Sequence, residues 1–117
     1  MASTEIDRFI WVEAHRVALD PEGYLVDLDD WTPAVAMAMA AEEGLELTDE
    51  HWEVIMVLRD FYARYEASPA MRPLVKAVGQ SLGSEKGRSL HLMHLFPESP
   101  AKVAARLAGL PKPANCL

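Results

Sequence analysis

The sequence is poor in cysteine and in long apolar runs. Its 117 residues include one cysteine, Cys116, which excludes an intrachain disulfide and a metal cluster built from several cysteines. The longest uncharged apolar run, residues 31–41, is shorter than the roughly 20 residues that a membrane-spanning helix requires. The first ten residues contain Glu5 and Asp7 where an export signal would be apolar. We therefore expect a cytoplasmic protein with no membrane segment.

The composition is that of one folded domain, with 50% hydrophobic and 25% charged residues over a length too short for two domains. We expect a single domain over residues 1–117. The net charge of −7 opposes general affinity for nucleic acid. Residues 1–66 contain sixteen acidic and four basic residues, a net charge of −12. Residues 67–117 contain two acidic and seven basic residues, a net charge of +5. This asymmetry predicts an electrostatically oriented partner, and an acidic solvated surface is the alternative.

Short segments rich in β-formers stand at the start of the chain. Residues 9–12 and 16–19 are joined through Glu13, Ala14 and His15 and are followed by the turn signal Asp20-Pro21-Glu22-Gly23, which predicts a β-hairpin. Residues 24–28 are expected to continue as extended chain. The fold class is therefore α+β, with an N-terminal hairpin packed on the helices that follow.

Capping residues, prolines and glycines divide the rest of the chain into about five helices. Thr32, Thr48 and Ser99 are predicted N-caps, and Gly44 and Gly109 are predicted stops. The expected helices cover residues 33–43, a segment starting after Thr48, and residues 72–83, 84–96 and 100–109. In the second helix, the apolar residues recur at helical spacing and predict the central core helix, with Arg59 on its polar face.

Residues 110–117, LPKPANCL, lack periodicity and predict an extended C-terminal arm that carries Cys116. An unpaired cysteine near a chain end is exposed where cysteine is usually buried, which favours a functional thiol. The alternative is an exposed cysteine without a role. Such an arm should bury little apolar surface, so truncation after Gly109 should leave the thermal stability almost unchanged.

The isolation of Cys116 also bears on its chemistry. A persulfide on one cysteine is discharged when a second thiol of the same chain attacks it, and this chain has no second thiol. Sulfur bound to Cys116 could therefore leave only to another molecule. The arm also lacks a histidine or acidic side chain that could act as a local base, so the pattern indicates a carrier rather than a hydrolase.

Four segments together resemble the TusE/DsrC family of small sulfur-carrier proteins: GLPKPANCL, FPESPAKVAARLA, EGLELTDEHWEVIMVLRDFY and SPAMRPLVKA. The resemblance spans about residues 11–117, and the ending is its most specific part. It implies a hairpin on a helical bundle with a mobile arm, and a persulfide on Cys116. Members that act in dissimilatory sulfur metabolism carry another cysteine eleven residues earlier. Ala105 occupies that position here, so the resemblance is to single-cysteine members.

The resemblance also implies a reaction and partners. It implies a sulfurtransferase that receives sulfur from a TusBCD-type donor complex and delivers it to an MnmA-type tRNA 2-thiouridylase, which modifies the wobble uridine. tRNA is then an indirect partner. No cofactor is implied, because the exchange is a displacement between sulfur atoms. Lys102, Arg106 and Lys112 are candidates for orienting the arm or contacting acidic partner surfaces, and solvated side chains are the alternative for each.

Two other interpretations compete with the sulfur relay. Residues 74–82, the Gly83-Ser84 turn and the segment from Lys86 onward could form a nucleic-acid-binding helix-turn-helix, with Arg72, Lys76, Lys86 and Arg88 as the phosphate contacts. His91 and His94 share a helix face and could contribute to a metal site. Zinc usually requires three or four ligands, however, and no nearby acid or cysteine completes the set, so we predict no metal site.

Overall fold

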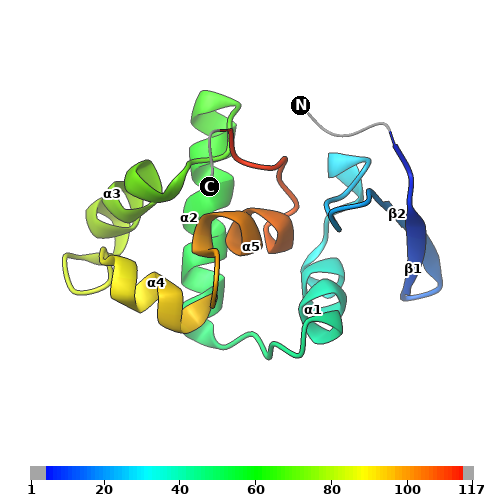
Figure 1. The fold of residues 1–117 in the computed structure, drawn as a ribbon, viewed down its shortest axis with the longest axis horizontal. Helices are drawn as coiled ribbons and strands as arrows, with labels where there is room; N and C mark the ends of the chain where they lie inside the picture. The colour runs from blue at the N-terminus through cyan, green and yellow to red at the C-terminus, as the bar shows by residue number, and fades with distance from the viewer. Residues whose placement is uncertain (1–4, 115–117) are drawn as a thin grey trace.

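The computed structural model describes residues 5–114 (Figure 1). A two-stranded antiparallel hairpin precedes the α-helices, so the predicted α+β class is confirmed. The elements in chain order are β1 (Arg8–Val12), β2 (His15–Leu19), a short 3-10 helix (Leu28–Asp30), α1 (Pro33–Glu42), α2 (Asp49–Tyr65), α3 (Met71–Leu82), α4 (Ser89–Leu95) and α5 (Pro100–Leu107).

The hairpin has a tighter turn than the sequence predicted. His15 belongs to β2 and pairs with Val12, so the connection is the two residues Glu13 and Ala14, with φ values of 48° and 66°. Two-residue hairpin turns with both φ values positive match the twist of the strands, although asparagine and glycine are usual there. Alternation along the strands places Ile10 and Val17 inside, while Trp11 is 71% exposed.

The predicted turn directly after the hairpin is confirmed over residues 20–23, and the segment that follows it is less regular than predicted. The Asp20 carboxylate accepts hydrogen bonds from the backbone N–H groups of Glu22 and Tyr24, each at 2.9 Å. Leu25 then forms a single bridge to Leu19, and the chain enters the 3-10 helix. The expectation of continuous extended structure over residues 24–28 is wrong, because the chain bends at Val26 and Asp27, where the Asp27 carboxylate accepts from the Asp29 N–H at 2.9 Å and favours a turn.

The first helix is as predicted at both ends. Thr32 Oγ1 accepts from the Val35 N–H at 3.1 Å, and Pro33 occupies the first turn of α1, where no N–H is needed. Gly44 has φ +70°, and the Leu45 N–H donates to the Ala40 carbonyl, which closes the helix.

A buried histidine joins the start of α2 to the end of α4. His51 Nδ1 accepts from the Thr48 N–H at 3.0 Å, and His51 Nε2 donates to the Leu95 carbonyl at 2.8 Å. Its ring also meets the edge of Phe96 with centroids 5.1 Å apart. The imidazole therefore substitutes for the glutamate usual in a capping box and also ties two helices together.

We expect His51→Ala to lower the free energy of unfolding by about 2–3 kcal/mol, because it leaves the Leu95 carbonyl and the Thr48 N–H without their partner and opens a cavity. Urea denaturation followed by circular dichroism measures the change. His94→Ala, on the exposed side of α4, is the matched control and should change stability by less than about 0.5 kcal/mol. A comparable loss in both variants would contradict the role given to His51.

The fourth helix is shorter than predicted. It begins at Ser89, and residues 84–88, which were predicted to be its first residues, form a turn. Gly87 lies directly against α3: a Cβ built there would come 2.4 Å from the Gly79 Cα. This backbone contact between two glycines requires the chain to reverse direction before α4 starts. Hydrophobic periodicity in the sequence does not indicate such a contact.

The core is built around α2, which runs through the middle of the molecule (Figure 1). Helix α5 contacts α1, α2, α3 and α4, and the hairpin packs on α1 at the opposite end from α3 and α4. Ser99 stands at the N-cap position of α5 as predicted, but its side chain makes no capping hydrogen bond. Among the described residues, no helix is both long enough and apolar enough to cross a membrane.

Candidate functional site

The predicted functional thiol, Cys116, lies outside the described residues, as does the end of the predicted arm. The structure instead describes the segment that leads to it, from the last turn of α5 to Ala114. The geometry of this segment decides where on the molecular surface the chain end begins.

The last turn of α5 is fixed to the rest of the molecule by an aromatic residue. Trp31 Nε1 donates to the Leu107 carbonyl at 2.8 Å. Gly109 has φ +73° and lies on the same indole, so that a Cβ built there would be 2.2 Å from Trp31 Cδ1. Only glycine fits this position, because both the left-handed conformation and the close contact exclude a side chain.

Arg59 completes this contact from α2. Its guanidinium lies over the Trp31 ring at 3.9 Å from the centroid and donates to the Ala108 carbonyl at 2.6 Å. Burial lowers the pKa of the Arg59 guanidinium. The sequence placed Arg59 on the polar face of α2, and the structure shows that its side chain is half-buried there, under the start of the arm. An isolated arginine in an amphipathic helix gives no signal of this use.

The first residues of the arm are packed on the body. Leu110, Pro111 and Pro113 are buried, and Ser68 Oγ donates to the Pro111 carbonyl at 2.6 Å. Lys112 is exposed, with its Nζ 2.9 Å from Glu22 Oε2. The expectation that the arm buries little apolar surface is therefore wrong for residues 110–113. This segment has no regular secondary structure and lies along the body of the molecule.

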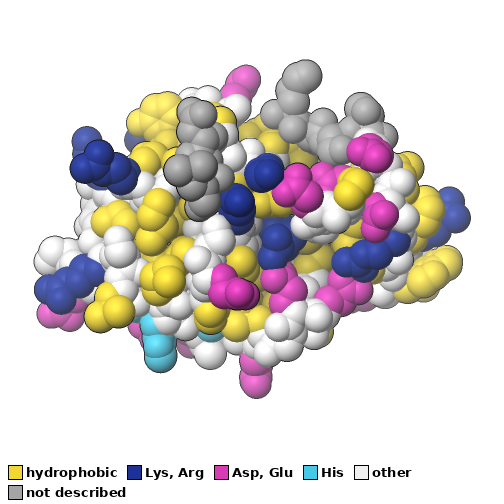
Figure 2. All heavy atoms as spheres, in the orientation of Figure 1, with side chains coloured by type: hydrophobic (Ala, Val, Ile, Leu, Met, Phe, Trp, Pro, Cys, Tyr) yellow, Lys and Arg dark blue, Asp and Glu magenta, His cyan; other side chains and the backbone are white. Residues whose placement is uncertain are grey.

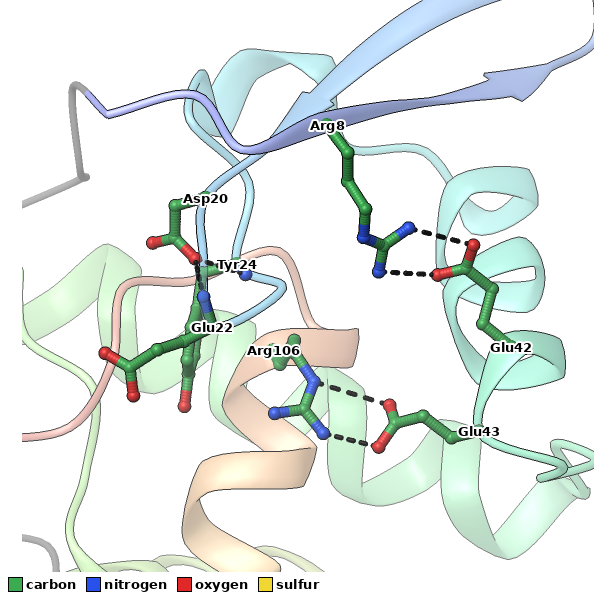
Figure 3. A network of polar contacts seen from close by, with 7 residues as sticks. All are labelled: Arg8, Asp20, Glu22, Tyr24, Glu42, Glu43 and Arg106. Carbon is green, nitrogen blue, oxygen red and sulfur yellow. Dashed lines mark hydrogen bonds and ion pairs between the residues drawn. The ribbon is translucent and has the colours of Figure 1, made fainter.

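The three basic candidate residues have different surroundings. Arg106 forms an ion pair with Glu43 in which Nη2 contacts Oε1 and Nε donates to Oε2 at 3.3 Å (Figure 3). Arg106, Glu22 and Arg8 also line a hollow of about 300 Å³. Lys112 pairs with Glu22 of the same hollow. Lys102 contributes its backbone carbonyl, which accepts from the Tyr24 hydroxyl at 3.3 Å. Arg106 and Lys112 are thus brought together at one face, and Lys102 lies one helical turn before Arg106.

Charges of the acidic half and the basic half face each other. Among residues 5–114, three ion pairs of lysine or arginine join a residue before position 67 to one after it: Lys86–Glu53, Arg106–Glu43 and Lys112–Glu22. Figure 2 shows basic side chains at the centre of one face, next to acidic ones. The charge asymmetry of the sequence therefore contributes to contacts within the chain, which reduces the charge left for orienting a partner.

The helix-turn-helix interpretation fits this geometry poorly. Lys86 donates to Glu53 at 2.6 Å, and this hydrogen bond raises the pKa of Lys86. Helix α4 contains neither lysine nor arginine, and the large apolar side chains Leu90 and Met93 share its exposed surface with Ser89 and His94. Arg72, Lys76 and Arg88 remain exposed.

The two histidines of α4 have different surroundings. His91 Nε2 is buried and lies 3.9 Å from Glu50 Oε2, while His94 is exposed. Within residues 5–114, no group of three or more histidine, cysteine, aspartate or glutamate side chains is arranged to hold a metal ion.

Comparison with known proteins relates the whole of this arrangement to one family. The family model described as "DsrC like protein" matches residues 11–117, which include both the anchored segment and the chain end. The chain belongs to this DsrC-like family. The resemblance inferred from the four sequence segments is therefore confirmed.

The relatives of this DsrC-like chain include named sulfurtransferases. The "Sulfurtransferase TusE homolog" of Haemophilus influenzae is 56% identical over 101 residues, which cover 86% of this chain and 93% of that protein. The "Sulfurtransferase TusE" of Salmonella paratyphi A is 50% identical over 105 residues, which cover 90% of this chain and 96% of that protein.

Solved DsrC structures have the same fold. The NMR structure of DsrC from Allochromatium vinosum superimposes with a TM-score of 0.86 at 53% identity, covering 94% of this chain and 98% of that one. The crystal structure of the oxidized gamma subunit of dissimilatory sulfite reductase from Archaeoglobus fulgidus gives a TM-score of 0.81 at 37% identity, covering 93% and 99%. The fold therefore persists across relatives with different names.

Proposed function

We propose that this DsrC-like chain is a sulfurtransferase that carries sulfur as a persulfide on Cys116. Two named TusE-type sulfurtransferases that match over most of their length support a sulfur-transfer role. The observation that carries the proposal is the position of Cys116, three residues beyond a point, Pro113, that is held on the folded body. A thiol on such a short tether can enter the pocket of another protein.

The proposed reaction consists of two displacements between sulfur atoms. The Cys116 thiolate attacks the terminal sulfur of a donor persulfide, the donor S–S bond breaks, and the donor leaves as a thiolate. Cys116 then carries the persulfide, whose outer sulfur is attacked by an acceptor thiolate while Cys116 is released as a thiolate. Each step forms one S–S bond and breaks one, so no external oxidant, reductant or cofactor enters.

For the partners we propose a TusBCD-type donor and an MnmA-type tRNA 2-thiouridylase as acceptor, as implied by TusE-like members. The residue at position 105 supports this choice over two-thiol chemistry. Ala105 is wholly buried in α5 and contributes no thiol. With one cysteine in the chain, sulfur on Cys116 cannot be released by an intrachain disulfide. Lys102, Arg106 and Lys112 are proposed to contact partner surfaces or to orient the arm.

The test of the carrier role is direct loading with sulfur. After incubation with a cysteine desulfurase, the donor complex and cysteine, we expect intact-mass spectrometry to show the gain of one sulfur atom, located on the C-terminal peptide. Protein that has first been alkylated at Cys116 is the control and should gain none. A parent protein that remains unmodified would contradict the carrier function.

A DsrC-like carrier with another final acceptor is the second candidate. It is favoured by the 53% identity to DsrC of Allochromatium vinosum, which is similar to the identity to the TusE proteins. The two candidates share the persulfide on Cys116 and differ in the acceptor. Loaded protein mixed with an MnmA-type enzyme, ATP and unmodified tRNA should yield 2-thiouridine if the tRNA route is correct, and should retain its sulfur if it is not.

A further inference from the structure

Side chains from three separate parts of the chain hold the end of α5 and the start of the arm. Trp31, Arg59 and Ser68 donate to the carbonyls of Leu107, Ala108 and Pro111, across 76, 49 and 43 residues respectively. We call these three residues the arm anchor. Trp31 precedes α1, Arg59 belongs to α2, and Ser68 follows α2.

The contacts of the arm anchor reach further along the chain than is needed to close the end of α5. The end of α5 is already closed by the Leu110 N–H, which donates to the Ala105 carbonyl, and by Gly109 in the left-handed conformation. The hydrogen bond from Ser68 to Pro111 and the burial of Pro113 lie four and six residues past the end of the helix. The anchor therefore fixes the path of the arm as well as the end of the helix.

Burial of the Arg59 guanidinium carries a desolvation cost that a purely structural contact would not require. Its guanidinium is half-buried, and among residues 5–114 no carboxylate lies within ion-pair distance of it. Removing a cation from water without an opposite charge costs free energy, offset here by the stacking on Trp31 and by the partial negative charge of the α5 C-terminus. A methionine in its place would fill similar space without that cost, but could not donate to Ala108.

We infer that Trp31 and Arg59 are positioning residues for sulfur transfer, which seat the arm so that Cys116 is presented from one fixed point on the surface. This inference rests on the proposed function. Pro113 is the last buried residue of the described arm. Cys116 follows it by three residues, and three residues of chain span at most about 10 Å. A donor or an acceptor must then dock on the face that carries residues 111–114, next to Glu22 and Ser68.

The first test measures arm release without sulfur chemistry. In a Cys116→Ser background, Ala114→Cys carries a nitroxide spin label at an exposed position of the arm. Trp31→Phe removes the indole donor and keeps a ring, and Arg59→Met removes the charge and keeps the stem. In each variant we expect the ratio of mobile to immobilised label to rise about tenfold, which is the factor that corresponds to one hydrogen bond from a charged or buried donor.

Matched variants separate arm release from general loss of stability. Trp52→Phe changes a half-buried tryptophan of α2, and Arg64→Met changes an exposed arginine of the same helix. Both should keep the label ratio of the parent. If Trp31→Phe does not fold, Arg59→Met and Ser68→Ala carry the test. Equal label ratios in all variants, or the same rise in Trp52→Phe, would overturn the inference.

The second test measures positioning in the reaction, in chains that retain Cys116. Loading by a small inorganic polysulfide should stay within twofold of the parent, because it needs no docked partner. With the protein donor, KM should rise about tenfold in Trp31→Phe and Arg59→Met with a smaller change in kcat, since a released arm docks less often. An unchanged KM in variants that release the label would overturn the positioning role. A parent that accepts no sulfur from either source would contradict the proposed function and leave the spin-label result standing.

Discussion

Replacement of Cys116 by serine is expected to abolish sulfur transfer while leaving the fold intact. Serine has nearly the same shape, but its oxygen does not accept a sulfane sulfur, and the chain contains no second thiol to substitute for it. Transfer of radiolabelled sulfur from the loaded donor to the acceptor should fall to the level seen without the protein. Circular dichroism and the thermal midpoint should match the parent.

The control for this experiment moves the thiol instead of removing it. In Cys116→Ser with Ala114→Cys, a thiol is present again but two residues closer to the anchored Pro113. If position matters, this variant should load with small polysulfide and should transfer poorly to protein partners. Full transfer activity in Cys116→Ser alone would rule out Cys116 as the carrier.

Local sequence signals were sufficient for most of the fold. The hairpin, the helix closed by Gly44 and the last helix starting at Pro100 follow from residues whose backbone preferences act over a few positions. Where a preference competes with a tertiary contact, the local signal is not enough. The turn at Glu13 and Ala14 has positive φ at two residues that do not favour it, because the strand register on either side requires it.

The early part of the predicted fourth helix illustrates the same limit. Residues 84–88 have no strong helix breaker apart from Gly87, so local sequence predicts a helix from Ser84. The structure uses Gly87 for a backbone contact with Gly79 of α3. A contact between two glycines depends on the packing of two elements and leaves no periodic pattern in either.

The candidate site was predicted in its chemistry but not in its support. Cys116 and its isolation are visible in the sequence, whereas hydrophobic periodicity does not indicate that Trp31, Arg59 or Ser68 hold the arm. Each contacts a backbone carbonyl at least 43 residues away. Carbonyls are present at every position, so a hydrogen bond to one of them imposes no complementary residue type that sequence reasoning could find.

The burial of the arm reverses the expectation for its removal, and the reversal can be measured. Truncation after Gly109 removes the buried residues Leu110, Pro111 and Pro113 and the hydrogen bond from Ser68. We expect a loss of about 2–4 kcal/mol in the free energy of unfolding, because the apolar burial of a leucine and two prolines outweighs the chain entropy regained by so short a segment. Chemical denaturation with a constant m-value measures it.

Two further variants test the cause of this loss. Truncation after Ala114 keeps every buried residue of the described arm and should leave the stability within about 0.5 kcal/mol of the parent. Leu110→Ala keeps the full chain and should cost about 2–4 kcal/mol through the cavity alone, without the new terminal carboxylate that truncation places near Arg59. If truncation after Gly109 changed the stability as little as truncation after Ala114, residues 110–113 would not be held on the body in solution. The arm anchor could then not position Cys116.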